Sequence, residues 1–317
     1  QWQVLQAAVD ADCIVIMQAA NTGLTGGSTP FGDDYDRPVV LISTRRLVGI
    51  QVINDGQQVI CLPGATLDRL EKELVPFNRE PHSVIGSSCI GASVLGGVCN
   101  NSGGALVRRG PAYTELALYA RVNDDGQLEL VNHLGVNLGE TPEEILSKLE
   151  TKNYQIGDII NNSGCCASDH RYGHDVKQVD ENTPARFNAD PSRLYEASGS
   201  AGKVCVFAVR LDTFEKIPSQ VFYVGTNSHD DLTEIRRFLL KDLPRLPIAG
   251  EYIHRVAYDI GAEYGKDTFM FIEKLGTAKV PAAFAMKDKV DAYLEKFGRK
   301  GLSDKVLQLI TKFLPNE

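Results

Sequence analysis

The sequence lacks any uninterrupted apolar run near the ~18 residues that a membrane-spanning helix needs. No charged segment leads into a short apolar stretch with a cleavage site, so we expect neither a transmembrane helix nor export. An excess of positive charge is also missing, because 33 Lys and Arg stand against 41 Asp and Glu, a net charge of −8. That balance removes the attraction on which non-specific nucleic-acid binding depends. DNA and RNA are therefore not expected partners.

Cysteine pairs and the familiar nucleotide-binding fingerprints are missing as well. The seven cysteines form an odd number and include no CxxC pair, which favours a reducing cytoplasmic compartment. No GxGxxG follows a predicted strand, and Gly261 to Lys266 is one residue short of a P-loop, so neither a Rossmann nor a P-loop domain is expected. The sequence opens at Gln1 inside a predicted helix, and we interpret it as part of a longer chain.

The 317 residues, 43% of them hydrophobic, suffice for about two folded domains. Short β-branched runs predict strands at Cys13–Met17, Val39–Ser43, Ile50–Ile53, Gln58–Leu62, Leu116–Val122, Leu128–Val131 and Val204–Leu211. Helical spacing and capping residues predict helices at Trp2–Ala11, Thr66–Leu74 and Thr141–Leu149. The polar region from Glu150 to Pro184 has no period and is expected to form an exposed loop.

Composition changes near Phe214–Pro218, where we expect a domain boundary. Beyond it, alternating patterns predict an α+β unit with strands at Val221–Val224, Ile248–Tyr252 and Thr268–Ile272 and helices at Asp231–Leu240 and Val256–Tyr264. Two amphipathic helices that contain lysine are predicted near Asp288–Phe297 and Ser303–Leu314.

The first informative segment, which we name the first loop, follows a predicted buried strand and reads Gln18-Ala19-Ala20-Asn21-Thr22-Gly23-Leu24-Thr25-Gly26-Gly27-Ser28. Its small residues let successive main-chain N–H groups converge into a concavity that binds an anion such as a diphosphate. The alternative is an ordinary glycine-rich turn, because isolated glycine patterns are weak signals. The position after a strand, and a second segment of the same kind, favour a diphosphate cradle.

That second segment, the second loop, runs from His82 to Gly104 and is nearly free of bulky side chains. Such a run can lie flat against a large planar ligand and bind it through main-chain groups. The alternative is a small-residue helix packed closely on a sheet, and for Ala92–Cys99 both interpretations are compatible.

In this order and spacing, the two loops resemble the flavin-binding domain of the vanillyl-alcohol oxidase type, also called the PCMH-type FAD domain. A closer resemblance is to the bacterial respiratory D-lactate dehydrogenases, at Met17–Pro30, Arg79–Gly104, Gly110–Glu115, Asn132–Pro142 and Val206–Phe214. It extends over almost the whole chain and weakens at Thr151–Asp180 and after Ala282. The resemblance implies an α+β fold: an N-terminally incomplete FAD domain of two α/β subdomains at 1–215, and the C-terminally incomplete start of a substrate cap and membrane-binding domain at 216–317.

Carried over only where motifs match, the FAD contacts implied by the resemblance lie in both loops and on a later strand. They are Ala19, Ala20, Asn21, Thr22, Gly23, Gly27 and Ser28 around the diphosphate, Gly86, Ser93 and Gly103 in the second loop, and Val206 at the nucleotide end. Many members of the wider superfamily bind flavin covalently through a histidine, and His82 is the histidine near these loops. The respiratory enzymes hold FAD non-covalently, and we expect the same here.

The resemblance implies FAD-dependent oxidation of D-lactate to pyruvate: a hydride leaves C2 of the D-2-hydroxy acid for flavin N5, a base removes the hydroxyl proton, and quinone reoxidises the flavin. The cofactor carries the difficult step. A substrate carboxylate needs a cation, ideally Arg, and the proton acceptor is commonly His. His254 and Arg255, at a predicted strand-to-helix junction, are therefore the candidate catalytic residues, with Arg255 on the carboxylate. A solvated helix start is the competing interpretation.

Two further polar motifs have competing interpretations. His170 and His174 lie four residues apart beside acidic groups, as divalent metal ligands can, but no third ligand follows nearby, and we predict no metal site. Arg108 and Arg109 either neutralise phosphate or form an ordinary surface pair.

The segment from Lys287 to Lys312 resembles the beginning of the family's membrane-binding region. It carries seven cations against four acids, with aromatic and aliphatic residues between them. Basic amphipathic helices of this kind rest on anionic leaflets, so we expect peripheral attachment to the cytoplasmic face of the bacterial inner membrane; a solvated face is the alternative. For the whole protein, the alternatives are a dehydrogenase of another D-2-hydroxy acid and a non-catalytic flavin-binding fragment.

Overall fold

The computed structural model describes residues 1–83, 91–103, 105–161, 164–182, 190–276, 279–298, 302–303 and 306. The chain divides into two compact units, Gln1–Ser88 with Ala92–Gly250 and Cys89–Gly91 with Glu251–Glu317. The described strands all lie in the first unit, and the described elements of the second are helices. The chain combines helices with strands that are mostly antiparallel. This combination confirms the predicted α+β class.

A five-stranded antiparallel sheet forms the centre of the first unit, in the order β3-β4-β8-β6-β7. Its strands are β3 (Ile50–Ile53), β4 (Gln58–Cys61), β6 (Ala117–Val122), β7 (Leu128–Asn132) and β8 (Cys205–Asp212). They confirm the strands predicted in these regions. Because β8 pairs with both β4 and β6, it joins segments that are far apart in the sequence.

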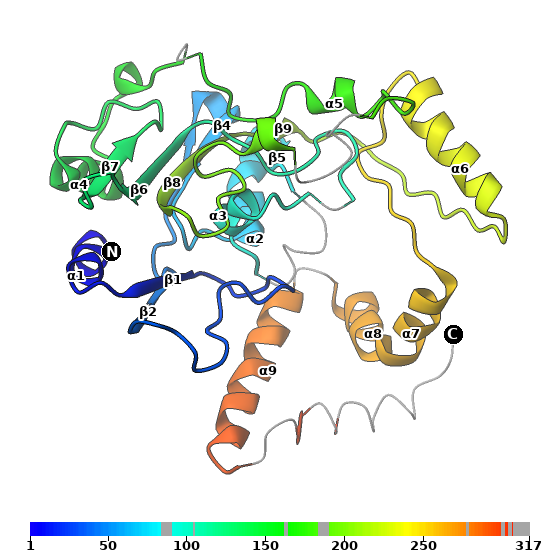
Figure 1. Ribbon diagram of the computed structural model, residues 1–317. Helices are drawn as coiled ribbons and strands as arrows, with labels where there is room; N and C mark the ends of the chain where they lie inside the picture. Colours follow the sequence, from blue (N-terminus) through cyan, green and yellow to red (C-terminus); the bar gives the residue numbers. More distant parts are fainter. Residues whose placement is uncertain are drawn as a thin grey trace. The chain divides into compact units, whose positions relative to one another are not determined.

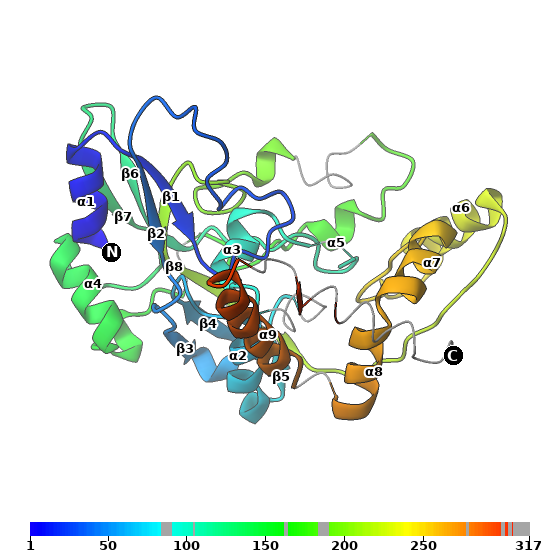
Figure 2. The ribbon, with the colours of Figure 1, turned by 90° about the horizontal axis from the view of Figure 1, so that it is seen from below.

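Both faces of this sheet are buried, since successive side chains of a strand point to opposite sides. On β6, Ala117 and Tyr119 contribute to one core, and Leu118 and Ala120 contribute to the other. Helices α2 (Leu67–Leu74) and α3 (Val94–Cys99) cover the first face. Helices α1 (Trp2–Asp10) and α4 (Pro142–Thr151) lie on the opposite side (Figure 1; Figure 2).

The three predicted N-terminal-unit helices are confirmed, and two of them have defined N-caps. The Thr66 side chain accepts a hydrogen bond from the Arg69 N–H, and α2 buries Leu67, Leu70 and Leu74. Thr141 and Glu144 form a reciprocal capping box at α4, with Pro at the first helical turn.

A separate two-stranded parallel sheet pairs β1 (Ile14–Gln18) with β2 (Val39–Ser43). Ile42 belongs to the second core, and Val15 and Met17 pack against it. Parallel neighbours need a long crossover connection rather than a tight turn. Here that connection is Ala19–Pro38, and its first half is the first loop.

Shorter elements complete the first unit. Strand β5 (Arg79–Glu80) pairs with β9 (Phe214–Glu215). Turns of 3-10 helix are η1 (Asn54–Gly56), η2 (Val75–Phe77), η3 (Ile156–Asp158) and η5 (Pro191–Arg193), and α5 is a single helical turn (Tyr172–Asp175). The described part of the polar stretch after α4 is thus mostly irregular, as predicted. The expectation that this stretch is exposed is wrong in part, because Ala167, Ser168, Val176 and Val179 are buried.

After β9, the predicted helices are confirmed but the predicted strands are wrong. Helix α6 (His229–Arg237) continues into a π-helical turn, η6 (Phe238–Asp242). Val221–Val224 is assigned to no strand, Ile248–Tyr252 contributes only an isolated bridge through Ala249, and Thr268–Ile272 is helical. A short apolar run has no period that separates a strand from a helix. In the structure, this run belongs to a helix of ten residues, Lys266–Leu275, that lies between Gly265 and Gly276.

The second unit contains α7 (Arg255–Tyr264), α8 (Lys266–Leu275) and α9 (Val280–Glu295). Helix α9 includes most of the first predicted lysine-containing helix and begins earlier. The second, near Ser303–Leu314, lies almost wholly outside the described residues. Within the described chain, no helix combines the length and the apolar character needed to cross a bilayer.

Candidate cofactor-binding site

The first loop is folded back on itself by polar side chains. Asn21 adopts a left-handed conformation with φ of 55°, and its Oδ1 accepts hydrogen bonds from Ser28 Oγ at 2.7 Å and Thr29 Oγ1 at 2.9 Å. Gln18 Nε2 donates to the Ser28 carbonyl at 2.7 Å. Asn tolerates this backbone conformation better than most residues. These contacts bring the two ends of the loop together.

The main chain of the first loop offers several unused donors. Among the described residues, the N–H groups from Ala19 to Gly23 have no hydrogen-bond acceptor. The Cβ positions of Gly23 and Gly27 face open space, with no atom within 4 Å. Successive free N–H groups beside glycine are the donor set that a diphosphate requires, so the residues present fit that group.

A chain of close main-chain contacts joins the first loop to the second. The Thr44 N–H donates to the Gln18 carbonyl at 2.8 Å, where the first loop begins. Gly64 packs so closely on this point that a Cβ would lie 2.4 Å from the Thr44 carbonyl oxygen. Its neighbour Ala65 accepts a hydrogen bond from the Val94 N–H at 2.9 Å. The start of α3, inside the second loop, is thereby held near the first loop.

The other predicted contact residues lie around this junction. Ser93 is buried and caps α3, its Oγ accepting a hydrogen bond from the Gly96 N–H at 3.2 Å. At Gly103, a Cβ would lie 2.6 Å from Pro111 Cα, so a larger residue would displace the end of the second loop. Gly86 lies outside the described residues.

Val206 is buried near the beginning of β8. The preceding residue, Cys205, lies against β1, with 3.6 Å between its Sγ and Met17 Sδ. Because β1 leads directly into the first loop, Val206 lies on a strand beside the start of that loop. The structure thus brings together three separate parts of the predicted set.

The base of the second loop contains a buried ion pair that sequence reasoning missed. Arg109 forms a salt bridge with Glu80 and donates to the carbonyl oxygens of Pro81 and His82 at 3.0 and 3.1 Å. Its guanidinium lies 4.1 Å from the ring centroid of Phe214. Arg109 is therefore engaged in holding the loop, while Arg108 donates to the Leu246 carbonyl. Adjacent arginines after a loop gave no signal of this inward role.

His82, the first residue of the second loop, is buried. Burial lowers the pKa of its imidazole to about 4, the Arg109 cation acts in the same direction, and a main-chain contact with Arg109 opposes the shift in part. The ring is therefore neutral at neutral pH. Only its proximity to a loop was visible in the sequence.

The candidate catalytic residues His254 and Arg255 lie at the start of α7, in the second unit. His254 is the N-cap, and its Nδ1 accepts a hydrogen bond from the Val256 N–H at 3.1 Å. Arg255 is 81% exposed and pairs with Asp259 one turn later, at 2.9 Å. The predicted helix start is present, and the strand predicted before it is not.

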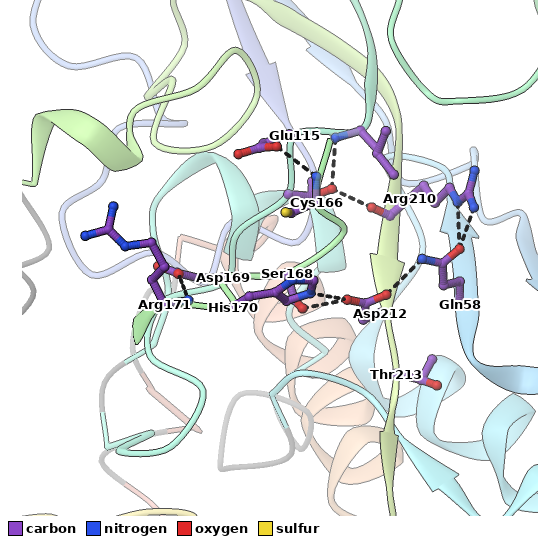
Figure 3. Close-up of polar contacts among 12 residues, drawn as sticks. Gln58, Glu115, Cys166, Ser168, Asp169, His170, Arg171, Arg210, Asp212 and Thr213 are labelled. Atoms are coloured by element: carbon purple, nitrogen blue, oxygen red, sulfur yellow. Dashed lines mark hydrogen bonds and ion pairs between the residues drawn. The ribbon is translucent and has the colours of Figure 1, made fainter. Parts of the chain in front are cut away.

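The two histidines of the possible metal motif interact separately. His170 approaches Asp212, which also accepts a hydrogen bond from Ser168, as Figure 3 shows, and His174 approaches Asp175. Gln58 bonds Asp212 from the other side and also binds the buried Arg210. No cluster of three His, Cys, Asp or Glu side chains suitable for a metal occurs in the described part of the chain.

Comparisons with known proteins give two family matches. Residues 3–131 match the FAD binding domain, and residues 221–317 match the family described as D-lactate dehydrogenase, membrane binding. Among solved structures, an alkyldihydroxyacetonephosphate synthase matches 67% of this chain and 29% of its own, with 13% identity and a TM-score of 0.39.

Two curated relatives cover 99% of the chain. The quinone-dependent D-lactate dehydrogenase of Haemophilus influenzae is 61% identical, and that of Escherichia coli is 58% identical. The chain spans 56% of the length of each relative. With this identity along its whole length, the chain belongs to the family of quinone-dependent D-lactate dehydrogenases.

Proposed function

We propose that the chain binds FAD non-covalently and serves the oxidation of D-lactate to pyruvate, with electrons passed to quinone. The N–H groups of the first loop, from Ala19 to Gly23, would hold the diphosphate together with Gly27 and Ser28. Gly86, Ser93 and Gly103 of the second loop would lie along the flavin, and Val206 would contact its nucleotide end. The unused N–H donors of the first loop carry this proposal, and the match of residues 3–131 to the FAD binding domain supports it.

Bound FAD supplies the hydride acceptor. On the protein side, we assign Arg255 to the carboxylate of the substrate, since an exposed ion pair with Asp259 is weak enough to exchange for a ligand. A ring whose Nδ1 accepts the Val256 N–H carries its hydrogen on Nε2, so His254 would take the hydroxyl proton at Nδ1, after releasing the cap of α7.

A peripheral position on the membrane completes the proposal. The match of residues 221–317 to a membrane-binding family supports it. The excess of Lys and Arg from Lys287 to Lys312 favours an anionic surface, and a cytoplasmic one is proposed because the anionic lipids face that side.

The cradle is tested by Gly23→Ala and Gly27→Ala. Both Cβ positions are open and neither backbone is left-handed, so the ligand-free variants should keep the stability of the native chain. A methyl group beside the diphosphate should weaken FAD binding by about tenfold or more. Gly225→Ala, also at an open position, is the matched control and should bind FAD normally. Isothermal titration with FAD measures all four proteins, and native affinity in both loop variants would contradict the cradle.

Substrate and acceptor need a separate measurement. D-lactate, but not L-lactate, should bleach the flavin band of the loaded protein and support reduction of a soluble quinone, and denaturation should release all flavin from the polypeptide. Faster turnover of another D-2-hydroxy acid would favour the alternative dehydrogenase. Flavin binding without any turnover would favour the non-catalytic fragment.

A further inference from the structure

Within the part of the chain that the structure describes, neither ring nitrogen of the histidine that opens the second loop makes a hydrogen bond of ordinary geometry, although the main chain of Arg109 lies near enough to affect its pKa. This residue, His82, is only 7% exposed. Buried polar atoms are nearly always paired in native proteins, because an unpaired one loses its hydration without compensation. Two unpaired nitrogens on one ring therefore need an explanation.

The surroundings of this ring are held firmly. Arg109 bonds the carbonyl oxygens of Pro81 and His82 and packs on Phe214. The His82 ring meets Phe214 edge-on, with 6.1 Å between the ring centroids. Since the main chain and the neighbouring ring are both fixed, the direction of the imidazole is set by the fold at the point where the second loop begins.

Because the His82 ring is neutral, a ligand that satisfies both of its nitrogens must offer one hydrogen-bond acceptor and one donor. Burial keeps the pKa of His82 far below neutrality, so the imidazole carries one donor and one acceptor. A diphosphate offers acceptors only and would favour a protonated ring. The isoalloxazine ring of a flavin has carbonyl oxygens, ring nitrogens and an N–H group along one edge, and it can therefore satisfy a neutral imidazole.

We propose that His82 is a hydrogen-bonding contact for the polar edge of the isoalloxazine ring of bound FAD. This rests on the proposed function, because it requires FAD in the cradle. It adds a buried side chain to a set of contacts that otherwise consists mainly of main-chain groups and small residues.

The test compares binding of FAD and ADP to the native chain, His82→Phe and His82→Gln. ADP contains the diphosphate and adenosine without the flavin ring. His82→Phe should weaken FAD binding about fivefold, the effect of one neutral hydrogen bond, and leave ADP binding unchanged. His82→Gln keeps a donor and an acceptor and should lose less. Ligand-free His82→Phe should melt no lower than the native chain, because the unpaired nitrogens are gone.

Each other outcome has a defined meaning. Native FAD affinity in His82→Phe, or an equal loss for FAD and ADP, would overturn the proposal, since the ring would then act only in packing. If His82→Phe does not fold, ¹⁵N spectra of the histidine-labelled native chain decide, with His82→Gln identifying the resonances among those of the six histidines. The His82 resonances must move with FAD and not with ADP, and their failure to do so overturns the proposal. A native chain that binds no FAD refutes the proposed function itself.

Discussion

At the residue scale, Arg109 satisfies groups that would otherwise be buried without partners. Its removal in Arg109→Ala leaves the Glu80 carboxylate, whose side chain is 16% exposed, without its counter-charge. Breaking a buried pair from one side costs about 3 kcal/mol or more, so the urea midpoint should fall accordingly. The matched control is Arg255→Ala, which breaks an exposed pair and should hardly move the midpoint. Equal effects of the two variants would contradict the buried role of Arg109.

His82 makes a defined contribution to stability as a function of pH. Its pKa in the folded chain, about 4, lies below the ordinary value of 6.5, so the unfolded chain binds the proton more readily. The free energy of unfolding is therefore unaffected by this titration above pH 6.5, and it falls by about 3 kcal/mol in total as the pH falls towards 4, because the buried ring resists the proton that the unfolded chain binds. Arg109 reinforces the shift, and Glu80 beside it is held in its salt bridge.

Urea denaturation of the ligand-free chain at several pH values between 4 and 7 measures this contribution. The slope of unfolding free energy against pH should be shallower in His82→Phe by up to one proton. Parallel slopes in the two proteins would mean that His82 titrates normally and is not buried as described.

At the element scale, Gly64 connects β4 to the turn after β2, and through it the two loops. In Gly64→Ala, the new Cβ would meet the Thr44 carbonyl oxygen at 2.4 Å, and main chain cannot move aside as a side chain can. We expect a loss of about 1–3 kcal/mol in stability and weaker FAD binding. Gly23→Ala should lose FAD affinity alone, so thermal melting and titration of both variants separate the two effects. A Gly64→Ala protein that melts normally would contradict the close contact.

The sequence supports prediction of elements better than of their connections. The first loop and α2 were predictable because small residues after a strand, and leucines at helical spacing after a capping Thr66, are local patterns. The helix at Thr268–Ile272 was missed because a run of four apolar residues after a Thr has no distinguishing period.

Long-range contacts left no local signal in the candidate site. The Gly64 packing, the Arg109–Glu80 pair and the burial of His82 each depend on residues distant in the sequence. Their residue types are common on protein surfaces, so composition and spacing alone do not distinguish them. The contact residues inside the two loops came from motif resemblance, and they remain predictions.

At the scale of the whole molecule, the proposed membrane contact depends on charge. The chain should sediment with vesicles rich in anionic phosphatidylglycerol at low salt and be released at high salt, with no binding to neutral phosphatidylcholine vesicles. Lys289 and Lys296 are exposed on or beside α9. Replacing both with Gln should weaken binding about tenfold. Lys177→Gln with Lys203→Gln, in the first unit, is the charge-matched control, and an equal loss there would contradict a localised contact.

The parallel pairing of β1 and β2 stands apart from the five-stranded sheet, and it has a consequence for local opening of the protein. A two-stranded ribbon has few neighbours to share its hydrogen bonds, so its amides should exchange with deuterium faster than those of β6 and β8. Since β1 ends where the diphosphate would be held, FAD should slow exchange in β1 and β2 far more than in the central strands. The bound ligand would then stabilise this two-stranded sheet against local opening, which the polypeptide alone does less well.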